Sequence, residues 1–133
     1  MASVSTAAKQ QRIIHVFSIS YFNRFIVTML VDQYHIVIGG EKLSGYLLNA
    51  QHPDGWAKAK FFLQHGFITE GDLITLLMFF ISNYEVSQKL ETKFGTKYIV
   101  EGAIPGLQAA SLRTVWIVLN GEKSCRFVTA YPL

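Results

Sequence analysis

Six polar side chains of this 133-residue chain are of types that act on phosphate groups without a metal ion. Cleavage of RNA by its own ribose 2′-OH needs a base that takes the hydroxyl proton and cations that stabilise the charge on the phosphate oxygens. It also needs a hydroxyl that donates to the phosphate or to the leaving group. His52 is a candidate base or acid, and the candidate cations and hydroxyl donors are Lys58, Lys60, Arg113, Thr129 and Tyr131.

Each of these residues also has an ordinary structural explanation. A His in the loop before a helix can serve only to start that helix, and lysines on helices are usually solvated. Arg in a strand usually pairs with an acid, while Thr and Tyr favour strands. The two interpretations differ in one observable: an enzyme would bring His52, Lys58, Arg113 and Thr129 to one concave site, whereas structural roles would leave them dispersed.

Other chemistries lack the necessary spacing. The sequence has no His-x-x-x-His or His-x-Glu pair and no Gly-x-Gly-x-x-Gly or Walker-type loop, so we expect no metal and no nucleotide cofactor. Cys125 stands alone, which excludes a disulfide framework, and its place before the last strand predicts a small buried side chain. A reducing, cytoplasmic location is expected.

Composition predicts one globular domain. Half of the residues are hydrophobic and 16% are charged, which excludes intrinsic disorder. Residues 1–12 are expected to form a flexible tail, and residues 13–133 a single domain. The apolar stretch from Ile13 to Ile38 contains charged and His residues, so no transmembrane helix is expected. The net charge of +3 is spread too evenly for a broad duplex nucleic-acid surface, but it leaves room for a small basic site.

Helices are predicted in the first part of the domain. The end of the Ile13–Ile38 stretch is expected to be extended, and residues 43–49 favour a short helix. A helix is predicted over residues 54–65, with Gly66 as its stop. Thr69-Glu-Gly-Asp72 has the spacing of a capping box that opens a helix over residues 73–83, with a further helical segment to about Leu90.

Strands are predicted in the second part, over residues 97–101, 112–119 and 126–131. Asn120-Gly121 is a hairpin signal, and a two-residue turn there would pair Leu112 with Thr129 and Arg113 with Val128. Arg113 and Arg126 would then lie on the face opposite to Thr129 and Tyr131. The expected fold class is α+β, with N-terminal helices packed on one face of a C-terminal antiparallel β-meander.

A series of short motifs runs from about Ile36 to Pro132. They stand at Lys42-Leu43, Tyr46–Asn49, His52-Pro53, Gly55, Lys58-Ala59, Phe62, Gly66, Glu91-Thr92, Gly95–Tyr98, Val100–Gly102, Arg113–Trp116 and Phe127–Pro132. Together they resemble a bacterial domain family described only as a domain of unknown function. The Lys-Ala pair of that family aligns with Lys58-Ala59, which favours Lys58 over Lys60. Residues before about Tyr34 lie outside the pattern.

Helices followed by an antiparallel sheet that ends in Thr129-Ala-Tyr-Pro are also similar to the metal-independent ribonuclease superfamily of barnase, EndoU, colicin and RelE-type toxins. This resemblance implies a catalytic set of His, Lys or Arg, and Thr, Ser or Tyr. It further implies that RNA is the substrate and that a small acidic antitoxin-like protein covers the RNA-binding cleft.

The alternative hypothesis is a non-catalytic interaction module that forms a homodimer. The mean hydropathy of +0.27 is high for so short a chain. The Phe-rich N-terminal stretch is expected to exceed what one core can bury, and exposed apolar patches of that kind mark interfaces.

Overall fold

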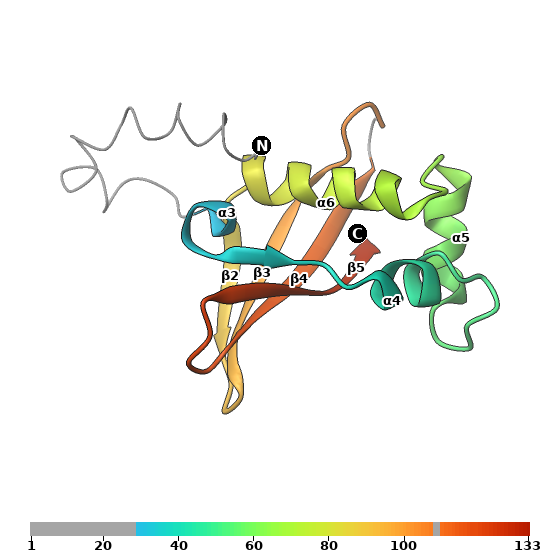
Figure 1. Cartoon of the computed structure of the whole chain (residues 1–133). Coiled ribbons are helices and arrows are strands. Elements are labelled where there is room, and N and C mark those ends of the chain that lie inside the picture. The colour runs from blue at the N-terminus through green and yellow to red at the C-terminus, as the bar shows by residue number, and fades with distance from the viewer. Residues whose placement is uncertain (1–28, 108–109) are drawn as a thin grey trace.

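The computed structural model describes residues 29–107 and 110–133, which form an α+β fold as predicted (Figure 1). The predicted tail at residues 1–12 and most of the Ile13–Ile38 stretch lie outside the described residues. The described elements, in chain order, are α3 (Leu30–Gln33), β1 (His35–Val37), α4 (Gly40–Lys42), the π-helix η1 (Leu43–Leu47), α5 (Trp56–Gln64), α6 (Glu70–Asn83), β2 (Val86–Glu91), β3 (Gly95–Ala103), β4 (Ser111–Leu119) and β5 (Ser124–Pro132).

The strands form one mixed, mostly antiparallel sheet in the order β1-β5-β4-β3-β2. Strands β3 to β5 make the predicted antiparallel meander, and β2 adds one further antiparallel strand beside β3. The short strand β1 adds to its edge in parallel to β5, which confirms the extended prediction at its residues. Helix α6 crosses one face of the sheet, and α4 and α5 gather near the end of β5 (Figure 1).

Helix α6 begins at the predicted capping box. Thr69 Oγ1 accepts from the Asp72 backbone N–H at 3.1 Å, and Asp72 Oδ2 accepts from the Thr69 backbone N–H at 2.9 Å. The backbone N–H groups of Thr69 and then of Ile68 lower the pKa of Asp72 by stabilising its carboxylate.

The helical continuation predicted to about Leu90 is wrong. Helix α6 ends at Asn83, Tyr84 is extended, and Val86–Glu91 is the edge strand β2. Most residues of β2 are exposed to solvent, and the apolar spacing that suggests a helix there rests on few residues. Backbone pairing with β3 decides the conformation instead of local periodicity.

The predicted β4–β5 register is also wrong. Asn120 and Gly121 lie in a four-residue loop between Leu119 and Ser124, with Gly121 at φ +80°. Farther along β5, Val128 is an extra residue in the ladder, a β-bulge. Arg113 therefore pairs with Tyr131.

In the same register Val115 pairs with Thr129. Arg113, Thr129 and Tyr131 consequently lie on one face of the sheet, because residues alternate in direction along each strand. The bulge thus brings to one face three side chains that a simple hairpin would separate.

The core fills the space between α6 and the sheet. Trp116 is fully buried and packs edge-on against Phe127, with ring centroids 5.3 Å apart. The other large, fully buried side chains are Phe62, Phe80, Leu30, Leu43, Leu47, Leu73, Leu77, Ile81, Ile104, Leu112 and Val100. Helices η1, α5 and α6 are therefore held against the sheet by one continuous apolar cluster.

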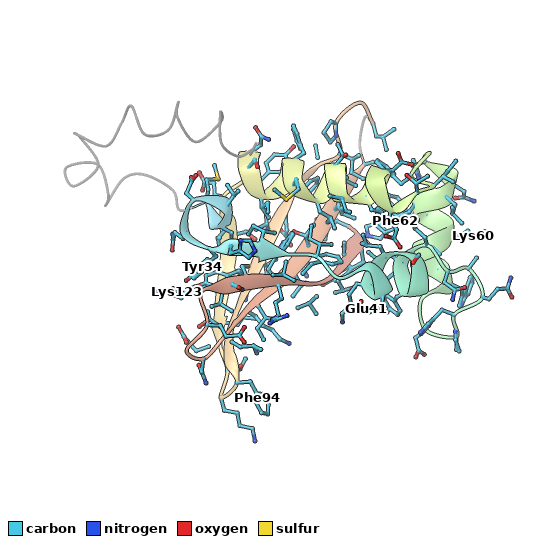
Figure 2. The ribbon with its side chains drawn as sticks, viewed as in Figure 1. Tyr34, Glu41, Lys60, Phe62, Phe94 and Lys123 are labelled. Carbon is cyan, nitrogen blue, oxygen red and sulfur yellow. The ribbon has the colours of Figure 1, made fainter. Side chains whose placement is uncertain are left out.

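Several large apolar side chains remain on the surface. Phe94 is 66% exposed at the tip of the β2–β3 hairpin, where Figure 2 shows it projecting from the fold. Ile68 and Trp56 are also more than half exposed. None of the helices in the described part of the chain is long and apolar enough to cross a membrane.

Candidate functional site

A pocket of about 450 Å³ lies where α4, η1 and the start of α5 meet β5. Its size falls in the range of small-ligand sites. The lining residues are Glu41, Lys42, Gly45, Tyr46, His52, Lys58, Val128 and Thr129. It therefore combines two cations, one carboxylate, an imidazole and two hydroxyl groups.

The ammonium group of Lys58 is held at the pocket by two neutral hydroxyls. Its Nζ donates to Tyr46 OH at 3.0 Å and to Thr129 Oγ1 at 3.2 Å. The same Nζ lies 4.9 Å from the ring centroid of Tyr46 and 5.6 Å from that of Tyr131. Within residues 29–107 and 110–133 no carboxylate forms an ion pair with Lys58. An ammonium has three N–H donors, so one remains for an anionic ligand.

His52 begins the turn that leads into α5 and also lines the pocket. Its Nδ1 accepts from the backbone N–H groups of Asp54 at 3.0 Å and Gly55 at 3.1 Å. A nitrogen that accepts hydrogen bonds carries no proton, so in this geometry the neutral ring has its proton on Nε2. No described group bonds to Nε2. Nδ1 thus serves the helix start, as the structural explanation expects, while Nε2–H is left as a donor.

Tyr46 joins these two residues, and the sequence analysis did not select it. Its ring meets the His52 ring edge-on, with centroids 4.8 Å apart and planes at 84°. It lies in η1, where Leu48 N donates to Leu43 O at 2.7 Å across a π-helical turn. Such turns often occur at functional sites. Tyr46 belongs to a quoted motif, but its spacing among leucines looks like that of an ordinary core residue.

Gly55 explains why the loop can approach Tyr46 so closely. A Cβ atom at Gly55 would lie 3.0 Å from the Tyr46 carbonyl oxygen and 3.1 Å from its ring. The absence of a side chain there lets the His52 turn pack directly against Tyr46.

Glu41 and Lys42, from α4, are the other residues that sequence reasoning missed. Both line the pocket, and Glu41 is exposed to solvent. Lys42 belongs to the Lys42-Leu43 motif, but a charged pair beside Gly39-Gly40 resembles an ordinary surface turn, so neither residue was selected as a candidate. Only the packing of α4 against β5 brings the pair to the pocket.

Arg113 does not line the pocket but lies beside Tyr131, its partner across the sheet. It forms an ion pair with Glu101, and its Nη1 donates to Tyr131 OH at 3.2 Å. The guanidinium carbon lies 5.7 Å from the Tyr131 ring centroid. The hydrogen bond to Tyr131 and then the one to Glu101 raise the pKa of Arg113. Tyr131 therefore stands between the two cations Arg113 and Lys58.

A family model described as "Domain of unknown function (DUF6883)" matches residues 29–133. The chain belongs to this family. Neither the curated proteins nor the solved structures contain a significant match to it. The DUF6883 match begins at residue 29, a few residues before the point near Tyr34 where the motif pattern was expected to begin.

In this DUF6883 domain His52, Lys58 and Thr129 meet at the pocket, and Tyr131 and Arg113 continue from it along the sheet face. Lys60 does not join them. It is exposed on the outer side of α5, whereas Phe62 faces the core (Figure 2). Lys60 points away from both Lys58 and Phe62 because residues two positions apart lie on opposite sides of a helix.

Thiol chemistry and metal binding are two further candidates in the DUF6883 domain. Cys125 is buried as predicted, and burial raises the pKa of its thiol to about 12. Among the described residues no group of three or more His, Cys, Asp or Glu side chains is placed to hold a metal ion.

Proposed function

We propose that this protein cleaves RNA without a metal ion, and that it binds the reacting phosphodiester in the Lys58 pocket. The observation that carries the proposal is the environment of Lys58. The ammonium is oriented by Tyr46 and Thr129, and no carboxylate of the described residues neutralises it. A positioned cation with a spare donor stabilises charge that develops on phosphate oxygens.

The neighbouring groups complete a site for one phosphate. The Nε2–H of His52 is a second donor. Thr129 Oγ1 accepts from Lys58, so the proton of its own hydroxyl is available to a ligand. Loss of one such donor typically slows an enzyme by about 10²–10³-fold. Lys42, which also lines the pocket, adds a further positive charge.

RNA fits this pocket better than a substrate that needs an external nucleophile. The ribose 2′-OH supplies the attacking oxygen, so the protein has only to transfer protons and stabilise charge. Mg²⁺ is usually held by carboxylates together with substrate phosphates. The pocket has one carboxylate against two lysines, a donor set that suits an anion rather than a divalent cation.

The proposal is tested by incubating the protein with total RNA in the presence of EDTA. We expect cleavage by the wild type, with 2′,3′-cyclic phosphate and 5′-hydroxyl ends on the products. Lys58→Met should reduce the rate at least 100-fold. Lys60→Met makes the same change on the same helix but outside the pocket, and should cleave like the wild type. RNA left intact by the wild type, or equal rates for the two variants, would overturn the proposal.

The same proposal includes a protein partner, a small acidic antitoxin-like protein that covers the pocket. Support comes from charge: Lys42 and Lys58 both line the opening, and a complementary acidic surface would bind there. RNA and this partner would compete, so excess partner should stop cleavage and Lys58→Met should weaken its binding.

An interaction module that forms a homodimer is the second candidate, and the exposed Phe94, Ile68 and Trp56 favour it. Light scattering, which gives the molar mass in solution, tests this candidate. A dimer mass that falls to the monomer mass in Phe94→Lys or Ile68→Lys would support the module. A monomer mass for the wild type would remove this candidate.

A further inference from the structure

We infer that Glu41 and Tyr46, rather than His52, transfer the protons in the cleavage proposed above. The inference rests on that proposed function and names two catalytic residues beyond the set that the sequence suggests. It follows from the hydrogen bonds of His52 and Tyr46 and from the place of the Glu41 carboxylate in the same pocket.

His52 is poorly placed for proton transfer. As a base it would need an unprotonated nitrogen towards the substrate, but its unprotonated Nδ1 faces the backbone N–H groups of Asp54 and Gly55. As an acid it would need a proton on both nitrogens, and a proton on Nδ1 would point at those same two donors. The ring therefore fits the role of a fixed hydrogen-bond donor through Nε2.

Tyr46 is placed to donate a proton. Its phenol oxygen accepts from Lys58 Nζ at 3.0 Å, so its own O–H proton is directed away from Lys58. The neighbouring ammonium would also face the negative charge that remains on the phenol oxygen after the transfer. Tyr46 lines the same pocket as the proposed phosphate donors.

Glu41 supplies the proton acceptor. It is the one carboxylate among the pocket-lining residues, and an ionised carboxylate is an acceptor only. It forms no ion pair with any group of residues 29–107 and 110–133. Its carboxylate lies over Gly39, where an added Cβ would come within 2.5 Å of Oε1. A bare backbone at Gly39 therefore permits this placement.

Cleavage of one phosphodiester leaves the protein unchanged. The 2′-OH gives its proton to the Glu41 carboxylate as the bond from the 2′-oxygen to phosphorus forms. The bond from phosphorus to the 5′-oxygen breaks, and that oxygen takes the proton of Tyr46. Water then returns a proton to Tyr46 while Glu41 loses one, so that both residues regain their starting states and the products are a 2′,3′-cyclic phosphate and a 5′-hydroxyl.

The test uses an oligoribonucleotide that the wild type cleaves, prepared with either oxygen or sulfur as the 5′ leaving atom. A thiolate leaves without a proton, so it removes the need for an acid. Tyr46→Phe should slow cleavage of the oxygen substrate at least 100-fold, but cleavage of the sulfur substrate only about tenfold, which is the loss expected when Lys58 loses one of its two oriented partners. Glu41→Gln should slow both substrates. Tyr84→Phe and Glu70→Gln are matched changes outside the pocket and should do neither.

Two further variants separate position from charge. Gly39→Ala keeps Glu41 but displaces its carboxylate, and should slow both substrates. Its backbone φ of −76° is accessible to Ala, so the fold is expected to persist. For His52, the Asn side chain can replace Nδ1 as acceptor and the Gln amide can replace Nε2–H as donor. We expect His52→Gln to retain more activity than His52→Asn.

The outcomes distinguish the two proposals. If the wild type cleaves neither substrate, the proposed ribonuclease function fails. If the wild type cleaves both but Tyr46→Phe is equally slow on both, or Glu41→Gln is fully active, the ribonuclease proposal stands and the assignment of Glu41 and Tyr46 fails.

Discussion

The two faces of the sheet differ in how their threonine hydroxyl groups are hydrogen-bonded. On the face covered by α6, Thr114 Oγ1 donates to Val100 O at 2.9 Å and accepts from Trp116 Nε1 at 2.8 Å. On the other face, Thr129 Oγ1 accepts from Lys58, and none of the described residues accepts the proton of its hydroxyl. The covered threonine is committed to the fold, whereas the open one keeps a donor for a ligand.

A single extra residue creates this difference. Because Val128 bulges from β5, Thr129 and Tyr131 share a face with Arg113. Bulges commonly redirect side chains beside functional sites. The buried face supplies stability, and the open face supplies chemical groups at little cost to the core.

Removal of the largest core side chain tests the covered face most severely. Trp116→Ala should lower the free energy of unfolding by about 3–5 kcal/mol, because Trp116 is fully buried. Trp56 is 53% exposed, so Trp56→Ala should change it by less than about 1 kcal/mol. Urea denaturation followed by circular dichroism measures both, and equal losses would contradict the assigned core.

The Thr114 hydroxyl offers a smaller test of the same face. Thr114→Val keeps the shape but leaves the Trp116 N–H without its acceptor, which should cost about 1–3 kcal/mol. Activity per folded molecule should stay at the wild-type level. A stability equal to that of the wild type in the same denaturation experiment would show that this buried network contributes nothing.

The pH dependence of the free energy of unfolding tests the burial of Cys125 on the covered face. Its folded pKa of about 12 lies above that of the thiol in an unfolded chain, near 8.5. Stability from the protonated thiol is therefore complete below about pH 8.5 and falls as the pH rises towards 12, by up to about 1.4 kcal/mol per pH unit. Comparison with Cys125→Ala isolates this slope. Parallel pH profiles would mean that the thiol is not buried.

The smallest expected effect concerns the start of α6. The pKa of Asp72 is lowered in the folded protein, so its carboxylate stabilises the fold above the unfolded pKa, near 3.9, and this contribution is lost as the pH falls. Asp72→Asn should therefore lower the melting temperature at pH 7 and have little effect at pH 3. An equal decrease at both values would indicate loss of packing rather than of charge.

Much of the fold could be predicted from local signals. Thr69 and Asp72 carry a complete capping box, and the β-rich runs around Trp116 and Phe127 give strands. The strand β2 could not be predicted in the same way, because Leu90 and its polar neighbours have no clear period. Pairing with β3, which depends on residues far along the chain, decides it.

The same distinction between local signals and long-range packing applies to the residues of the site. His52, Lys58 and Thr129 are chemically distinctive and could be selected from the sequence, whereas Glu41 and Tyr46 acquire a role only through packing of α4 and η1 against β5. The relation of Arg113 to Thr129 was missed because a bulge leaves no mark in the sequence of β5.

The most direct test of the contrast between the two faces is the rate of RNA cleavage by Thr129→Val, measured in EDTA beside the wild type and Thr114→Val. We predict that Thr129→Val unfolds at the wild-type temperature and cleaves at least tenfold more slowly, because Lys58 loses one of its two oriented partners. A Thr129→Val protein as active as the wild type would contradict the claim that the open face is reserved for the substrate.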